Sequence, residues 1–148
     1  MCWSSGKDSA WALHALRTGG EVEIAGLLTT INQAAGRVAM HGVRERLVEM
    51  QADALRLPLT KVLIPEPCSN AQYEAAMAAA VSRAKADGVT AMAFGDLFLD
   101  DVRRYREDRL AATGITPLFP IWGRETARLA RDMVGSGLRA HVTCVDPN

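Results

Sequence analysis

The chain has 148 residues, a length that suits one ordinary domain able to bury roughly two-thirds of the surface of its unfolded chain. Hydrophobic residues make up 49% and charged residues 23%, proportions that exclude an intrinsically disordered chain. The 17 acidic residues balance the 17 basic ones, so overall charge would not attract nucleic acid or an anionic membrane.

Short apolar segments alternate with amphipathic patterns along the chain, which is typical of βαβ units and a parallel sheet. Helices on both faces of such a sheet give an α/β fold with three layers, an α/β/α sandwich with a mainly parallel sheet. Five helices are expected between the strands. The predicted strands span residues 1–3, 24–29, 60–64, 89–94, 116–119 and 139–145.

The predicted helices carry apolar residues at helical spacing, so each has one face to lay on the sheet. In the third helix, Ser69 and Gln72 fit a capping box at the start, and Gly88 is placed to end it. No linker or repeat interrupts the pattern, so we assign residues 1–148 to one domain, and we expect both its ends to be clipped. The apolar stripes are Trp11, Leu13 and Leu16, then Val43, Leu47, Met50 and Ala54, then Tyr73, Met77, Val81 and Ala84.

Residues 4–9 join the first predicted strand directly to the first helix, a geometry typical of anion binding. Backbone N–H groups at a helix start lack intrahelical partners, and the helix dipole places about half a positive charge there. Hydroxyl donors, a small residue and one cation add to this. The candidate phosphate-binding residues are Ser4, Ser5, Gly6, Lys7, Asp8 and Ser9.

Asp8 is the unexpected residue in this loop, because a carboxylate repels phosphate unless a metal ion bridges the two or a backbone donor holds it. We therefore predict a nucleotide bound with Mg²⁺, and Asp8 as the metal ligand. The loop is not a Walker A motif, which requires a Gly five positions before Gly6 and Ser or Thr at position 8. No GxGxxG motif is present to support a dinucleotide site.

Residues 4–9 resemble the SGGxDS loop of the PP-loop ATP pyrophosphatases, with Ser5 where that motif usually has its first glycine. The variant is similar to that of the diphthine-ammonia ligase-like branch. The resemblance covers essentially the whole chain, and the further segments follow in the order usual for that branch. They are MHGVR at 40–44, FGDL at 94–97, Arg103 with Glu107, and LFPIWGR at 118–124.

The resemblance implies a Rossmann-like sheet of the adenine nucleotide alpha hydrolase type, with ATP across the carboxyl ends of the strands. Such a position agrees with the crevice rule for open α/β sheets. In such proteins the end of the second strand, here Thr29 and Thr30, meets the adenosine. Gly95 lies beside the nucleotide, and Asp96 is a candidate catalytic residue.

Several candidate residues have an ordinary structural alternative. Asp96 follows a strand and a glycine, where a carboxylate either acts on a ligand or caps the next helix. Arg103 and Glu107 are four apart, so spacing alone favours an exposed ion pair, and only the resemblance makes them catalytic candidates. The arginines at 103, 104 and 106 alternate with acidic residues and indicate a solvated helix face rather than an RNA groove.

The remaining singular residues are less specific. His41 either contacts phosphate or is a surface or capping residue, and Trp122 is expected at the edge of the core. Cys68 and Cys144 are expected to be structural. The three cysteines have no CxxC spacing, which favours a reducing compartment. No segment approaches the ~18 consecutive apolar residues of a membrane span. We therefore predict a cytoplasmic protein.

The leading functional hypothesis is an AMP-forming amide ligase with ATP and Mg²⁺. A substrate carboxylate attacks the α-phosphorus, pyrophosphate leaves into the loop, and ammonia displaces AMP from the acyl-adenylate. Two alternatives stay open: a tRNA-modifying enzyme of the same fold, and a non-catalytic adenine nucleotide sensor. The carboxylate acceptor is not identified, a nucleic-acid partner and a membrane are disfavoured, and a homodimer is left open.

Overall fold

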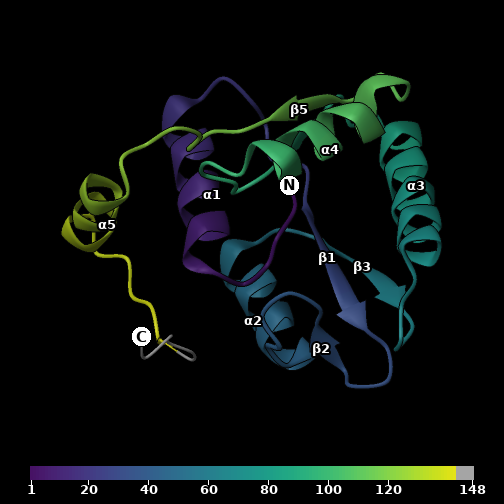
Figure 1. Ribbon diagram of the computed structural model, residues 1–148. Coiled ribbons are helices and arrows are strands. Elements are labelled where there is room, and N and C mark those ends of the chain that lie inside the picture. Colours follow the sequence, from purple (N-terminus) through teal and green to yellow (C-terminus); the bar gives the residue numbers. More distant parts are fainter. Residues whose placement is uncertain (143–148) are drawn as a thin grey trace.

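The computed structural model describes residues 1–142, and Figure 1 shows a mixed α/β arrangement of helices around two small sheets. No helix in this part of the chain has the length and apolar character that crossing a bilayer requires. In chain order the elements are α1 (Lys7–Gly19), β1 (Leu27–Asn32), β2 (Arg37–Val38), α2 (Glu45–Leu55), β3 (Leu59–Ile64), α3 (Asn70–Ala86), β4 (Ala91–Ala93), α4 (Asp100–Ala111), β5 (Thr116–Leu118) and α5 (Thr126–Gly135).

The strands pair in two sheets that the first residues of the chain connect. β1 lies between β2, which is antiparallel to it, and β3, which is parallel, while β4 and β5 form a parallel pair. Cys2 forms a parallel bridge with Leu28, and its N–H donates to the carbonyl of Ala93 at 2.9 Å. Residues 1–3 thus lie between β1 and β4, and the loop at residues 4–9 begins where they end.

The core contains two clusters on opposite faces of β1, because alternate residues of a strand point to opposite sides. Leu27 and Ile31 pack with buried residues of α1 and α2, whereas Leu28 packs with buried residues of α3 and α4. Figure 1 accordingly shows β1 and β3 between α3 and the pair α1 and α2. A third cluster joins Trp11 of α1 to Leu129 of α5.

The third helix agrees with its prediction. Ser69 and Gln72 form the capping box, and Tyr73, Met77 and Val81 pack on the cluster that contains Leu28. In α2 the predicted stripe is wrong by about one residue: Leu47 and Met50 are exposed, and Val48 and Ala52 are buried. The cause is tertiary, because α2 packs on β2 through its smaller side chains.

Three strand predictions need correction, and one strand was not predicted. At residues 1–3 the structure has only an isolated bridge at Cys2 instead of a strand. The strand predicted at 24–29 lies at Leu27–Asn32, where pairing with β3 fixes its limits. The two-residue strand β2 has no predicted counterpart, since it arises only from pairing with β1 after a turn. Residues 139–142 form no strand, and the rest of the segment predicted at 139–145 lies outside the described residues.

Candidate functional site

The loop at residues 4–9 changes direction at Ser5, whose φ of 65° lies in the left-handed region. This conformation is unusual for a residue with a side chain and suits glycine. Trp3, just before the loop, is buried, and α1 begins within the loop at Lys7. The sharp turn therefore takes the chain from the centre of the sheet into a helix within three residues.

The start of α1 has the properties of an anion-binding site. Gly6 is the N-cap residue, and it has no side chain that could accept a hydrogen bond from the first turn. In the described residues, the N–H groups of that turn therefore have no side-chain cap. The helix dipole adds partial positive charge at this end. A phosphate group would satisfy both features.

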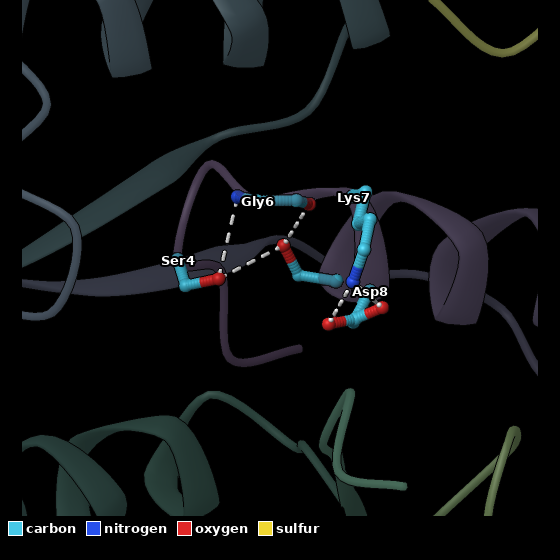
Figure 2. A network of polar contacts seen from close by, with 5 residues as sticks. Ser4, Gly6, Lys7 and Asp8 are labelled. Carbon is cyan, nitrogen blue, oxygen red and sulfur yellow. Dashed lines mark hydrogen bonds and ion pairs between the residues drawn. The ribbon is translucent and has the colours of Figure 1, made fainter. Parts of the chain in front are cut away.

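Hydrogen bonds within the loop show which serine hydroxyls hold its shape (Figure 2). The Ser9 hydroxyl donates to the Gly6 carbonyl at 2.9 Å, so the 3.2 Å contact between Ser4 Oγ and Ser9 Oγ must use the proton of Ser4. The Ser4 oxygen in turn accepts from the Gly6 N–H at 3.3 Å. Both protons are thus committed to the loop, and Ser4 and Ser9 act here as shaping residues.

Ser5 differs from the other two serines because its buried hydroxyl has no hydrogen-bond partner within residues 1–142. Thr29, which is 2% exposed, has a buried hydroxyl in the same condition. Buried polar atoms are normally paired, so such groups point to a water or ligand that completes them. Thr29 and Thr30 lie in the middle of β1 and not at its end as predicted, because the strand continues to Asn32. Thr30 is half-buried and is the more accessible of the two predicted adenosine contacts.

Lys7 and Asp8, the predicted cation and metal ligand, contact each other. Lys7 Nζ lies 2.7 and 2.9 Å from the two oxygens of Asp8, and Figure 2 shows the pair at the first turn of α1. Their side chains are 56% and 34% exposed, and an ion pair of that kind contributes about 0–1 kcal/mol. A charged ligand can therefore separate the two groups at little cost.

Two residues from elsewhere in the chain border the loop. A Cβ on Gly95, just after β4, would lie 2.8 Å from Ser9 N and 2.9 Å from Asp8 C, so only glycine fits there. His41 Nδ1 lies 2.9 Å from the Ser4 carbonyl, which only accepts, so Nδ1 is the donor. His41 therefore contacts the loop and is not a helix cap.

Asp96 follows Gly95 and forms a forked ion pair with Arg106 of α4. Arg106 Nε donates to Oδ2 at 2.5 Å and Nη2 to Oδ1 at 3.2 Å, with the two side chains 26% and 18% exposed. The guanidinium of Arg106 also lies 4.3 Å from the centre of the Phe94 ring. The capping alternative for Asp96 is wrong, because the N-cap of α4 is Leu99 and no side-chain bond caps it in the described structure.

Arg103 and Glu107 form the expected pair, with Nε of Arg103 donating to Oε1 at 2.8 Å. The guanidinium of Arg103 also lies over the rings of Phe119 and Trp122, 4.7 and 4.8 Å from their centres. Phe119 stacks in turn on Phe94, with ring centres 5.6 Å apart. We call Phe94, Arg103, Arg106, Phe119 and Trp122 the arginine–aromatic layer.

This layer corrects the prediction of a solvated helix face for the three arginines. Arg104 is exposed, but Arg103 and Arg106 are half-buried on the aromatic rings. Trp122 is half-buried and contacts Arg103 and Phe119. Arg106 was not predicted as a neighbour of Asp96, although its spacing of three from Arg103 places both on one helix face.

The cysteines and metal ligands add little to the site. Burial raises the pKa of the Cys2 thiol, which favours its neutral form, and Cys68 is a free, half-buried thiol. Cys144 lies outside the described residues. Within residues 1–142, no group of three or more His, Cys, Asp or Glu side chains could hold a metal ion.

Comparison with known proteins now decides the relationship. The family model of the diphthamide synthase N-terminal domain matches residues 1–115. The chain belongs to this family. The match contains residues 4–9, Gly95, Asp96 and all of α4, and it confirms the resemblance to the diphthine-ammonia ligase-like branch of the PP-loop proteins. A comparison with curated proteins finds no match.

Proposed function

We propose that this diphthamide synthase-like domain binds ATP with the terminal phosphates at residues 4–9 and cleaves it between the α and β phosphates. The observation that carries the proposal is the loop itself. It combines the turn at Ser5, the start of α1 without a side-chain cap, and the close fit of Gly95 against Asp8 and Ser9. Lys7 would supply the positive charge for the leaving pyrophosphate.

The rest of ATP would lie across the carboxyl ends of the strands, in a three-layer α/β/α sandwich with a mainly parallel sheet. The parallel pairs β1–β3 and β4–β5 and the core clusters on both faces of β1 support this architecture. Ligands of such sheets bind in the crevice beyond the carboxyl ends of the strands. Thr30 would then face the adenosine from the middle of β1.

Mg²⁺ fits the chemistry of the loop. This ion is usually held by one or two carboxylates together with substrate phosphates, so the lack of a protein-only cluster among the described residues does not conflict with it. Asp8 is a partly exposed carboxylate beside the phosphate-binding N–H groups and would be its ligand. When bound, the ion would neutralise charge on the pyrophosphate oxygens.

The proposed reaction activates a carboxylate for amide formation with ammonia. A carboxylate oxygen attacks the α-phosphorus, the bond from that phosphorus to the bridging oxygen breaks, and pyrophosphate leaves with the electron pair. Ammonia then attacks the acyl carbon, and AMP leaves with the second electron pair while the nitrogen loses a proton. Asp96, next to the residue that touches the loop, would orient the acceptor, and Arg103 with Glu107 would border it.

The test is to incubate the protein with ATP, Mg²⁺, ammonium and candidate carboxylates while AMP, ADP and pyrophosphate are followed. Formation of AMP and pyrophosphate in equal amounts, dependent on the acceptor, supports the proposal. ADP with phosphate would contradict it, and stoichiometric binding without turnover would indicate a nucleotide sensor. Turnover stimulated by tRNA instead of a small carboxylate would favour the tRNA-modifying alternative.

The cellular context belongs to the same proposal. A cytoplasmic location fits the free thiols of Cys2 and Cys68, since disulfides are rare in reducing compartments. The oligomeric state, including a homodimer, is to be measured by light scattering before kinetic analysis, so that activity is expressed per site.

A further inference from the structure

We propose that Arg106 is a positioning residue that acts through Asp96, fixing the carboxylate in one orientation beside the phosphate-binding loop. This inference rests on the proposed function and deepens it. It concerns a residue that none of the sequence motifs assigned to the site.

The first observation is the geometry of the pair. Nε and Nη2 of Arg106 bond to different oxygens of Asp96, at 2.5 and 3.2 Å. Two parallel bonds fix the plane of the carboxylate as well as its position, which a single contact does not do. Each oxygen keeps a lone pair for one further hydrogen bond, so Asp96 remains able to accept from a bound molecule.

The second observation is that Arg106 is itself held. Its guanidinium lies 4.3 Å from the centre of the Phe94 ring, and that ring stacks on Phe119. Arg103, one turn earlier on α4, lies over Phe119 as well. The Phe94 ring therefore holds one face of the donor fork and is itself backed by Phe119, so little freedom is left for Asp96 to change its orientation.

The third observation is the location of Asp96. The preceding residue, Gly95, approaches the backbone of Asp8 and Ser9 so closely that a Cβ would not fit. Asp96 thus follows a segment that is in contact with the phosphate-binding loop, and Arg106 of α4 sets its orientation. A carboxylate so placed contributes to catalysis through its geometry, because a displacement of about 1 Å can cost on the order of a hundredfold in rate.

The experiment compares Arg106→Gln, Arg106→Lys and Asp96→Asn, the double variant Arg106→Gln with Asp96→Asn, and the control Arg104→Gln. Arg104 has the same charge on the same helix but is exposed. Acceptor-dependent AMP release gives kcat and KM, calorimetry gives ATP affinity, and thermal melting gives stability. We expect Arg106→Gln to lower kcat about ten- to a hundredfold with ATP affinity nearly unchanged. Arg106→Lys should restore part of kcat, since lysine keeps the charge without the fork.

The double variant separates positioning from simple stabilisation. If Arg106 acts through Asp96, removing both should reduce kcat no further than removing Asp96 alone. If the two single losses in kcat multiply in the double variant, the ion pair is structural and the positioning role is overturned. The same follows if Arg106→Lys has normal kcat and a lowered melting temperature. Neither result would contradict the proposed function. A wild-type protein that never releases AMP would overturn the proposed function together with this role.

Discussion

Replacing Gly95 with alanine tests the contact between β4 and the phosphate-binding loop. The new Cβ would lie 2.8 Å from Ser9 N, 2.9 Å from Asp8 C and 3.0 Å from Asp8 O. All three atoms are backbone, so none can turn away as a side chain would. Relief requires a shift of the start of α1 or of the segment after β4, and overpacking of this kind costs about 1–3 kcal/mol.

For a domain of this size, 1 kcal/mol shifts the melting temperature by about 2–4 °C, so Gly95→Ala should melt roughly 2–12 °C below wild type. Affinity for ATP should fall as well, since the shift displaces the N–H groups of the first turn. Gly135→Ala is the matched control, because nothing lies within 4 Å of its Cβ position in α5. That change should be neutral or stabilising by up to about 1 kcal/mol.

Thermal melting and calorimetry with ATP measure both effects. A Gly95→Ala protein that melts and binds like wild type would show that Gly95 does not touch the loop, and it would remove the basis for placing Asp96 beside it.

Three further predictions concern the loop and the first strand segment. Ser5→Gly should keep or raise the melting temperature. Glycine removes the cost of the left-handed backbone at Ser5, about 1–2 kcal/mol, which exceeds the cost of the greater entropy of glycine in the unfolded chain, about 0.4–1 kcal/mol. A lower melting temperature would contradict a strained Ser5. Lys7→Ala should weaken ATP binding about ten- to a hundredfold and leave adenosine binding nearly unchanged, as measured by calorimetry, and equal losses for the two ligands would argue against a phosphate role. Burial raises the pKa of the Cys2 thiol above its ordinary value of 9.0, so the thiol ionises at lower pH in the unfolded chain than in the folded one. The free energy of unfolding that this group contributes is therefore complete below pH 9 and is lost as the pH rises. Melting curves from pH 7 to 10 should therefore fall less steeply for Cys2→Ala, and iodoacetamide at pH 8 should label the wild-type residue only after unfolding.

The parts of the site that depend on neighbours in sequence could be predicted. The loop at residues 4–9 lies at a junction of strand and helix, and its composition shows both the turn and the free N–H groups. The capping box of α3 is also local, and the structure confirms it. Such features need no knowledge of where distant segments pack.

The parts that depend on packing could not be predicted. The sequence favoured a ligand-contacting role for Asp96 over a helix cap, and only the placement of α4 shows that Arg106 reaches it. The same holds for Arg103, whose aromatic neighbours come from beyond β5. The stripe of α2 was displaced by one residue because Val48 and Ala52, rather than Leu47 and Met50, join the core cluster that contains Val38 of β2.

The position of residues 1–3 between the two sheets affects how the loop can open. The N–H groups of Cys2 and Trp3 donate to Ala93 and Leu28, so the segment that leads into the loop is bonded to both sheets. Local fraying of the loop is therefore limited at its first residue, and complete release of that anchor requires the sheets to separate. In hydrogen-exchange terms, the amides of Cys2 and Trp3 should exchange with the slowest group, through global unfolding. Slow exchange of these two amides would show that the phosphate-binding loop is attached to the most stable unit of the domain, in contrast to binding loops that open independently of their scaffold.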